Sequence, residues 1–463
     1  MIPVSLNQIA MDTRGRLLAE GSGDTIAASV TIDSRTVAGG ALFVAIPGER
    51  VNGHDFAKAA LDGGAAGVLV EDPDRAVANG ADPARLIAVP STQDALGHLA
   101  RASLRRIREV ANPLVVGVTG SVGKTTTKDL LATLLEPRGP IIAPPGSFNN
   151  ELGLPLTVLR ADENTATLVL EMGADKIGNL EHLTDIAPLD IGVVLAVARA
   201  HLGEFGGIEN VAKAKSELVS GILPEGVAIL NADDHRVAAM SSKAHKVVTF
   251  SATGSGDVTA SDIALGDDGR ASFTLGHCGN TASVSLGLVG EHHVSNALAA
   301  AAVGIVSGMD LTEIAERLGG VGAASPHRMD VWQSGDLTVI DDSYNANPDS
   351  MRAGIRALSQ LGKGPKVAVL GAMLELGEES DAEHTSVGLE LGQLGIDTLV
   401  AVGAPALAEG ARQADVSAVD VTDIGSAWPV VLSLAGQSGT ILLKGSNGSK
   451  IWQLADRLKE EMC

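Results

Sequence analysis

The fold is decided by residues 115–127, which read Val-Val-Gly-Val-Thr-Gly-Ser-Val-Gly-Lys-Thr-Thr-Thr. A short apolar run breaks into glycines, and an apolar pattern at helical spacing follows from Asp129 to Leu135. This order predicts a strand, a phosphate-binding loop and a helix, because glycines let backbone N–H groups turn around an anion at a helix N-terminus. Lys124 can then reach the outer phosphates of a nucleotide, and the Thr125 hydroxyl can ligate Mg²⁺.

A nucleotide is therefore expected on a loop whose members are Gly120, Ser121, Val122, Gly123, Lys124, Thr125 and Thr126. Val118 stands where the general Walker pattern has glycine. The alternative is a glycine-rich turn without a ligand, but such a turn does not require Gly-Lys-Thr at the start of a helix.

The size and charge of the chain narrow the class of protein. Its 463 residues are too many for one hydrophobic core, so about two to four domains are expected, and no apolar run could span a bilayer. A net charge of −22 and an aromatic content of 2% argue against binding nucleic acid. With two cysteines and no basic-then-apolar segment at the start, we expect a reduced, cytoplasmic protein without a secretion signal.

Turn-rich segments divide the chain into three predicted domains, at residues 1–112, 113–323 and 324–463. The first is a small α/β domain, with helices expected at 54–65 and 92–107 and strands at 30–37, 41–48, 67–70 and 86–89. Ser34 and Arg35 lie among polar groups at strand and helix ends, where ligands often bind. Capping and surface turns explain these residues equally well.

Two buried strands are expected after the loop helix in the central domain. Continuous apolar runs at 167–170 and 191–197 are separated by helical sequence, which indicates parallel strands. Glu171 follows the first run and His201 lies beyond the second, so both can meet the phosphate loop at the carboxyl edge of the sheet. Glu and His suit a Mg²⁺ site, although either could be only a cap or a salt-bridge partner.

A lysine lies within the apolar face of the next predicted helix, residues 208–223. At about 100° per residue, Lys215 falls in the stripe formed by Ile208, Val211, Ala212, Leu218, Val219 and Ile222. Lys213 and Glu217 fall on the opposite face, as a solvated pair should. A buried ammonium must shift its pKa, snorkel or find a partner, so the pattern leaves open snorkelling, an ion pair, chemical modification and ligation near a metal.

Short β segments are expected at 245–290, before an alanine-rich helix at 297–306. Asn296, at the start of this helix, carries a donor and an acceptor that suit an adenine edge, with simple capping as the alternative. A linker of small residues at 319–325 then precedes the third domain.

The third domain alternates strands and helices, as in a doubly wound sheet. Polar turns follow two of its strands, at 341–348 and 444–448. The expected strands lie at 337–340, 366–370, 398–402 and 441–443.

In this order the motifs resemble the Mur ligase family, ATP-dependent amide-forming enzymes of peptidoglycan synthesis. The resemblance covers essentially the whole chain and rests on 119–126, Glu171, His201, Lys215, 292–296, 326–328 and 341–343. Within the family, the segments 33–35, 148–153, 342–348 and 444–446 look most like the branch that adds D-alanyl-D-alanine. The Tyr-Ala-His-Thr-Pro and Asp-Asn-Pro-Arg elements of the tripeptide-forming branch are absent. Glu291 and His293 stand where relatives often have Arg and Asn, and Asn52 replaces a frequent Asp.

The resemblance implies a domain for the UDP substrate, a central P-loop ATPase domain with a mostly parallel sheet, and a Rossmann-like domain that closes over nucleotide and amine. The implied reaction joins D-alanyl-D-alanine to the terminal carboxylate of UDP-N-acetylmuramoyl-tripeptide through an acyl phosphate, with release of ADP and phosphate. We expect a monomer that binds only small molecules.

The resemblance also implies roles for individual residues. It places catalysis on Lys124, Glu171, His201 and Lys215, and two Mg²⁺ ions on Thr125, Glu171, His201 and an N-carboxylated Lys215. It adds Asn296, Arg328 and Asp342 to the ATP site. Substrate contacts are implied for Ser34, Arg35, Asn149, Asn150, Glu151, Tyr344, Asn347, Lys444 and Ser446.

Two other classes of protein remain as alternatives. One is another carboxylate–amine ligase, either a tripeptide-forming relative or a folylpolyglutamate-type enzyme, although the Gly-Ala-His-Asn-Pro element of the latter is absent. The other is a nucleotide-binding regulatory protein with a degenerate site. The presence of Lys124, Glu171, His201 and Lys215 argues against degeneracy.

Overall fold

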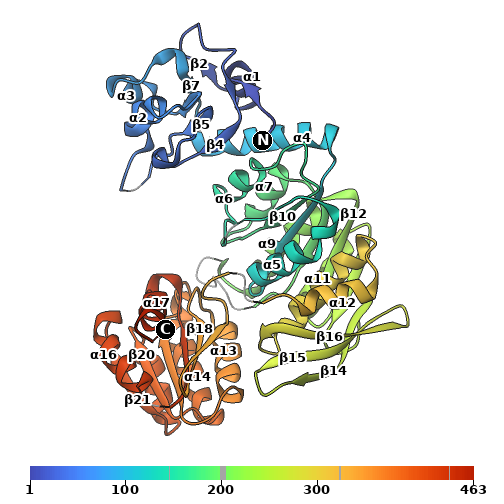
Figure 1. Ribbon diagram of the computed structural model, residues 1–463, viewed down its shortest axis with the longest axis vertical. Helices are drawn as coiled ribbons and strands as arrows, with labels where there is room; N and C mark the ends of the chain where they lie inside the picture. Colours follow the sequence, from blue (N-terminus) through green and yellow to red (C-terminus); the bar gives the residue numbers. More distant parts are fainter. Residues whose placement is uncertain (49, 145, 199–204, 323–324, 437, 463) are drawn as a thin grey trace.

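The computed structural model describes the chain except for residues 49, 145, 199–204, 323–324, 437 and 463. Its three main sheets draw their strands from the three predicted segments in turn. In Figure 1 the first lies at the top, and the third lies at the lower left, beside the lower end of the central domain. The α/β class and the three-domain fold are confirmed, and the boundaries at 112/113 and 323/324 stay predictions. Among the described helices, none has the length and apolar character needed to cross a bilayer.

The N-terminal domain consists of β1 (Val4–Ser5), α1 (Leu6–Asp12), β2 (Arg16–Leu17), β3 (Ile26–Ala27), β4 (Ser29–Thr31), β5 (Ala41–Val44), α2 (Ala57–Asp62), β6 (Gly67–Val70), α3 (Pro73–Ala78), β7 (Leu86–Ala88) and α4 (Thr92–Val110). Its sheet has the order β2-β7-β6-β5-β4, and only β2 runs antiparallel to its neighbour. The strand predicted at 30–37 is wrong beyond Thr31. The Asp33 carboxylate accepts from the Arg35 N–H at 3.0 Å and caps a short 3₁₀ turn instead.

The central domain consists of β8 (Leu114–Thr119), α5 (Lys124–Leu134), β9 (Ile141–Ile142), α6 (Gly153–Val158), β10 (Thr167–Glu171), α7 (Asn179–Ile186), β11 (Leu189–Val194), α9 (Ile208–Ser220), β12 (Ile222–Asn231), α10 (His235–Ala238), β13 (Val247–Ser251), β14 (Val258–Leu265), β15 (Arg270–His277), β16 (Asn280–Val289), α11 (His293–Val306) and α12 (Leu311–Gly319). Its sheet has the order β16-β15-β14-β13-β12-β11-β8-β10-β9. The strands from β9 to β14 are parallel, whereas β15 and β16 are antiparallel additions at one edge.

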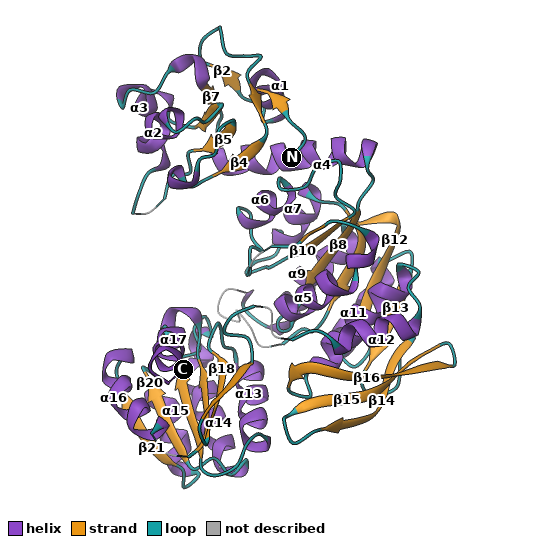
Figure 2. Ribbon diagram, viewed as in Figure 1, coloured by secondary structure: helices purple, strands orange, loops and turns teal. Residues whose placement is uncertain are grey.

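The C-terminal domain consists of β17 (Asp330–Ser334), β18 (Leu337–Asp342), α13 (Pro348–Gln360), β19 (Lys366–Gly371), α14 (Ser380–Gln393), β20 (Thr398–Val402), α15 (Pro405–Gln413), β21 (Ser417–Val421), α16 (Ile424–Ala435), β22 (Gly439–Lys444) and α17 (Ile451–Met462). Its order is β17-β18-β22-β19-β20-β21, parallel except for β17, with helices on both faces (Figure 2). The doubly wound sheet is confirmed. The edge strands β17 and β21 were not predicted.

Packing separates the C-terminal domain from the other two. Helix α4 packs on α6 and α7, and one continuous core contains Leu99 of α4 together with Leu183 of α7. The Met1 amino group donates to the Leu159 carbonyl at 2.8 Å across the same junction. The described core of the C-terminal domain, in contrast, takes in only Val289 from the central domain. The first two domains therefore form one block, and the third is attached mainly by its linker and polar contacts.

Candidate active site

The phosphate-binding loop connects β8 to α5 at the carboxyl edge of the central sheet. Gly123 caps α5 with a φ of 82°, and a Cβ there would lie 2.3 Å from the Asn296 Oδ1 of α11, so the position requires glycine. The Lys124 ammonium donates to the Gly120 carbonyl at 2.8 Å. Desolvation is the largest cause of a lowered pKa at Lys124. A desolvated lysine beside a helix N-terminus is typical of a phosphate site.

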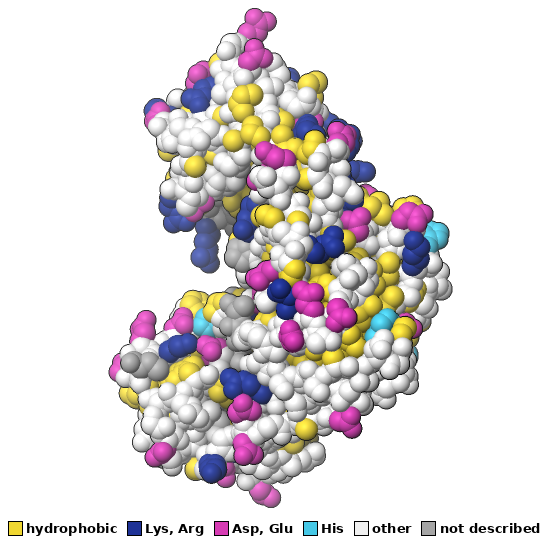
Figure 3. All heavy atoms as spheres, turned by 45° about the vertical axis from the view of Figure 1, so that its right-hand side comes forward, with side chains coloured by type: hydrophobic (Ala, Val, Ile, Leu, Met, Phe, Trp, Pro, Cys, Tyr) yellow, Lys and Arg dark blue, Asp and Glu magenta, His cyan; other side chains and the backbone are white. Residues whose placement is uncertain are grey.

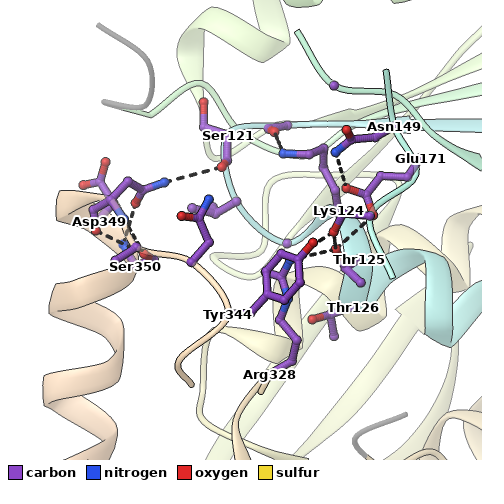
Figure 4. Close-up of a pocket in the computed structure, with 18 of the residues that line it drawn as sticks. Ser121, Lys124, Thr125, Thr126, Asn149, Glu171, Arg328, Tyr344, Asp349 and Ser350 are labelled. Atoms are coloured by element: carbon purple, nitrogen blue, oxygen red, sulfur yellow. Dashed lines mark hydrogen bonds between the residues drawn. The ribbon is translucent and has the colours of Figure 1, made fainter. Parts of the chain in front are cut away.

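A hydroxyl and a carboxylate lie beside this loop. Thr125 Oγ1 donates to Glu171 Oε2 at 2.9 Å and lies 3.1 Å from Ser147 Oγ (Figure 4). Asn149 Nδ2 donates to the other oxygen of Glu171 at 2.9 Å. Hydroxyl and carboxylate oxygens suit Mg²⁺, which usually completes its shell with phosphate oxygens and water. No group of three or more His, Cys, Asp or Glu side chains could hold a metal among the described residues, so an ion here would depend on the nucleotide for further ligands.

Lys215 lies on α9 and is only 4% exposed, as the helical periodicity predicted. Within the described chain, no carboxylate forms an ion pair with its ammonium. Burial lowers the pKa of Lys215 well below its usual value, and the nearby Lys124 lowers it further. The expected solvated pair of Lys213 and Glu217 is wrong, because Glu217 accepts from the Gly178 N–H at 2.7 Å. His201 lies outside the described residues, so its place in the site stays a prediction.

Arg328 reaches this cluster from the start of the C-terminal domain. Its Nη2 donates to Thr125 Oγ1 at 3.1 Å and to Ser147 Oγ at 3.3 Å. Its guanidinium carbon lies over the Tyr344 ring, 4.1 Å from the ring centre, in a cation–π contact beside the phosphate loop (Figure 4). The residues on either side, His327 and Met329, have left-handed φ values of 60° and 52°. The chain is thus sharply turned on both sides of the arginine that enters the site.

Asp342 and Lys444 form a buried pair behind Arg328. Lys444 Nζ donates to Asp342 Oδ2 at 2.6 Å and to the Asn345 carbonyl at 3.0 Å. The other oxygen of Asp342 accepts from the Met329 N–H at 3.2 Å. In the structure, Asp342 therefore fixes the turn after Arg328.

A second contact joins the two domains across the cavity. Asn347 caps α13 in a capping box with Ser350, and Pro348 occupies the first helical position. Its Nδ2 also donates to the Ser121 carbonyl of the phosphate loop at 3.5 Å. The N-terminus of α13 therefore faces the loop directly.

One cavity of about 630 Å³ connects these groups. The sequence-predicted residues that line it are Gly120, Ser121, Val122, Gly123, Lys124, Thr125, Thr126, Asn149, Asn150, Glu151, Glu171, Lys215, Asn296, Arg328, Asp342, Tyr344, Asn347 and Lys444. Further lining residues that the sequence did not suggest include Ser147, Asp175, Asn179, Ser350 and Arg356. The sequence did contain a signal for the lining residues on α13. Asp349, Ala353 and Arg356 are spaced so that they share one face of this helix, which lines the cavity.

Three of the predicted residues lie away from this cavity. Ser34 and Arg35 belong to the N-terminal domain, where exposed Arg35 pairs with Asp33 at 2.7 Å. Ser446 is 4% exposed, accepts from the Leu374 N–H at 2.9 Å and donates to the Ala346 carbonyl at 3.1 Å. Lysine and arginine side chains gather at the lower edge of the N-terminal domain, above a recess between that domain and the C-terminal one (Figure 3). This local positive charge contrasts with the net charge of −22.

Comparison with known families and structures agrees with this geometry. Models of a "Mur ligase family, catalytic domain", a "Mur ligase middle domain" and a "Mur ligase, glutamate ligase domain" match residues 27–104, 118–304 and 327–447. The chain is 41% identical to the UDP-N-acetylmuramoyl-tripeptide–D-alanyl-D-alanine ligase of Mycobacterium tuberculosis H37Rv, over 99% of this chain and 98% of that one.

Solved structures extend the likeness to three dimensions. A crystal structure of MurF from Acinetobacter baumannii matches with a TM-score of 0.89 and 33% identity, over 99% of both chains. MurF from Thermotoga maritima in complex with ADP matches with a TM-score of 0.81 and 30% identity, over 94% of this chain and 98% of that one. Sequence, domain order and fold therefore agree along the whole length, and the chain belongs to the Mur ligase family.

Proposed function

We propose that the chain is an ADP-forming carboxylate–amine ligase that joins D-alanyl-D-alanine to UDP-N-acetylmuramoyl-tripeptide during peptidoglycan synthesis. Relatives that cover the chain from end to end are named for this reaction. The observation that carries the proposal is structural. Lys124 and Thr125 of the central domain meet Arg328 of the C-terminal domain at one cavity, as expected of an enzyme that transfers a phosphoryl group between two bound substrates.

The first step moves the γ-phosphoryl group of ATP onto the terminal carboxylate of the tripeptide, giving ADP and an acyl phosphate. A carboxylate is a poor electrophile, and the new phosphate is the leaving group that it lacks. Lys124 and the loop N–H groups would offset charge on the transferring phosphoryl group, and Arg328 would bring a further cation. Asn296 and Asp342 would hold the nucleotide from opposite domains.

Mg²⁺ fits the residues present. Thr125 and Glu171 would hold one ion, since their oxygens lie 2.9 Å apart, and His201 with Lys215 would hold a second. When bound, the ions supply charge neutralisation at the phosphates.

Lys215 is proposed to carry an N-carboxyl group. The neutral amine attacks CO₂, a new N–C bond forms, and one proton is released to give a carbamate anion. Burial supports this proposal because it lowers the pKa of Lys215 and so favours the neutral amine. The carbamate would place a second negative charge near Lys124, in addition to that of Glu171.

The second step is attack of the amine of D-alanyl-D-alanine on the acyl carbon. The tetrahedral intermediate expels phosphate, an amide bond forms, and the amine loses a proton. Asn347, Tyr344 and Lys444 face the cavity from the C-terminal side and are proposed to border the dipeptide. Ser446 would support this wall through the backbone of Ala346 rather than contact substrate.

The UDP-linked substrate is proposed to extend from the N-terminal domain toward the cavity. Ser34 and Arg35 would contact its UDP end, and Asn149, Asn150 and Glu151 its peptide. Closure of the C-terminal domain would exclude water from the hydrolysable acyl phosphate. We further propose that the enzyme acts as a cytoplasmic monomer, in keeping with the small-molecule nature of all its substrates.

The decisive experiment measures phosphate release by the purified full-length chain with ATP, Mg²⁺ and UDP-N-acetylmuramoyl-tripeptide. Release should require D-alanyl-D-alanine and should match formation of the pentapeptide product by mass spectrometry. A panel with D-glutamate, L-lysine, meso-diaminopimelate and L-glutamate as acceptors provides the comparison. A preference for any of these amines, or no release with all of them, would refute the assignment.

A further inference from the structure

Lys128 is a buried lysine outside the cavity, and its contacts reach a loop that enters the cavity. It lies on α5, one turn after Lys124, and its side chain is 3% exposed. Its Nζ donates to the Pro144 carbonyl at 2.9 Å and lies 3.5 Å from the Gly146 carbonyl. A buried ammonium needs such partners, because an unpaired one is strongly unfavourable. Lys128 therefore holds Pro144 and Gly146, which come shortly before Ser147, against α5.

The next residue, Asp129, connects the same turn of α5 to the interdomain linker. Asp129 Oδ1 lies 2.7 Å from the Lys128 ammonium, and Asp129 Oδ2 accepts from Ser325 Oγ at 2.6 Å. Ser325 stands three residues before Arg328. Ser325 and Arg328 also line one small hollow together with Asp129 and Thr126. The linker is thus fixed to α5 immediately before it delivers the arginine.

These contacts close a ring around Thr125. The loop held by Lys128 supplies Ser147, whose hydroxyl lies 3.1 Å from Thr125 Oγ1. The linker held by Asp129 supplies Arg328, which donates to both of these hydroxyls at 3.1 and 3.3 Å. Neither Lys128 nor Asp129 lines the cavity, so their influence on it must pass through the two segments that they hold.

We propose that Lys128 and Asp129 are positioning residues: Lys128 holds Pro144 and Gly146, Asp129 holds Ser325, and in this way Ser147 and Arg328 reach Thr125 together. Movement of the C-terminal domain away from the central domain breaks the Ser325 bond. The Asp129 carboxylate is then held by Lys128 alone. The residues that Lys128 contacts, Pro144 and Gly146, become less ordered although they do not contact Ser325. The kinetic consequence rests on the proposed function, whereas the structural coupling can be measured without it.

The coupling is tested by hydrogen–deuterium exchange in the full-length protein, comparing wild type with Ser325→Ala and Asp129→Asn. Faster exchange is expected in two separate peptides, one covering 322–331 and one covering 141–152. The control is Ser334→Ala, which also removes a serine hydroxyl bond, here from Ser334 Oγ to the neutral Met462 carbonyl at 2.8 Å, and touches neither segment. If both Ser325→Ala and Asp129→Asn change exchange only in the 322–331 peptide, the proposal is overturned.

Steady-state kinetics provide the second readout. For Ser325→Ala, kcat should fall about tenfold, the effect on an equilibrium of losing one hydrogen bond to a charged group, while KM for ATP stays within about twofold. Lys128→Met should lower kcat further, and Lys128→Arg should restore part of it because an ammonium-like donor again faces the loop. An equal rise in KM for ATP in all variants, or no rescue by arginine, would count against a positioning role. Exchange that spreads as expected in a protein without ligase activity would leave the coupling intact and refute only the proposed function.

Discussion

Two buried lysines line the cavity from opposite domains, and their surroundings differ. Lys444, on the C-terminal wall, is 2% exposed and is bonded to the Asp342 carboxylate and to the Asn345 carbonyl, at 2.6 and 3.0 Å. Lys215, on the central wall, is 4% exposed, has no ion-pair partner among the described residues and lies near another cation, Lys124. Lys444 thus finds its partners within its own domain, and Lys215 finds no ion-pair partner among the described residues.

The same contrast holds for two histidines. His327, beside Arg328, has its Nδ1 2.8 Å from the Asp341 carboxylate. His293, behind the phosphate loop, is 4% exposed, and its Nε2 has no hydrogen-bond partner in the described part of the chain. Buried polar groups without partners are costly, so Lys215 and His293 are suited to a ligand that supplies the missing partners. Lys444 and His327 thus have partners within the C-terminal domain, whereas Lys215 and His293 of the central domain leave groups that a ligand could satisfy.

Among the variants that test this contrast between the central and C-terminal sides of the cavity, Lys124→Ala should have the largest effect. If the central wall exists to hold phosphate, this variant should lose ATP-dependent phosphate release by about 10³-fold or more, the scale of a lost phosphoryl-group cation. Its thermal unfolding should change little, because among the described residues the ammonium donates its one hydrogen bond to the Gly120 carbonyl. Turnover near the wild-type rate would remove the phosphate-loop assignment.

The next test is Lys215→Ala, which should lower kcat by about a hundredfold, as loss of metal-supporting groups typically does. Added acetate or formate should restore part of the rate by supplying a carboxylate oxygen in the space left by the side chain. Mass spectrometry of the native wild type should also find an added CO₂ on this lysine. Absence of both rescue and modification would show that Lys215 is an ordinary buried lysine.

Lys444→Met should differ from the two preceding variants, because its main effect should be a lower free energy of unfolding. Its effect on phosphoryl transfer should be smaller. Removing one member of a buried pair leaves Asp342 unpaired, at a cost of about 3 kcal/mol in the free energy of unfolding. Lys246→Met is the matched control, since it removes an exposed pair with Glu225 and should cost less than about 1 kcal/mol. Equal losses in the two variants would erase the distinction between the walls.

The smallest expected effect is the pH dependence contributed by His293. Burial, with His292 nearby, lowers the pKa of His293 in the folded protein well below 6.5, so the unfolded chain binds a proton more readily. Stability therefore falls as the pH drops below about 6.5, by up to about 1.4 kcal/mol per pH unit from this group. His293→Gln should flatten the change in unfolding free energy between pH 7 and pH 5. The denaturation profiles of the two proteins would be parallel if His293 titrated normally.

How much of the fold the sequence reveals depends on burial. Strands β8, β10 and β11 are covered on both faces, so their continuous apolar runs predicted them correctly. The edge strand β21 is half exposed and reads as Ser-Ala-Val-Asp-Val, which carries no such run. The strand expected at 30–37 failed because Asp33 bonds to its own neighbours and turns the chain, a local competition that hydrophobicity does not record.

The site residues that could be predicted are likewise those whose positions depend on local sequence. The phosphate loop was predictable because its geometry is local, and Lys215 because helical periodicity placed a charge in an apolar stripe. Ser147 was missed because its position depends on Lys128, which holds the preceding residues through tertiary bonds. Lys444 and Ser446 stand two residues apart and looked equivalent, yet one lines the cavity and the other supports backbone. Only the path of the chain in space separates them.

The contact between Arg328 and Tyr344 has a spectroscopic consequence. Tyr344 is the single tyrosine of the chain, and the three tryptophans, Trp332, Trp428 and Trp452, all belong to the same domain. Tyrosine and tryptophan fluorescence of the unlabelled protein therefore arises from the C-terminal domain alone. The Trp452 ring lies 6.3 Å from that of His327, so this emission is sensitive to the turn that carries Arg328. Rotation and unfolding of the C-terminal domain can thus be followed by its fluorescence, without a tyrosine or tryptophan signal from the other two domains.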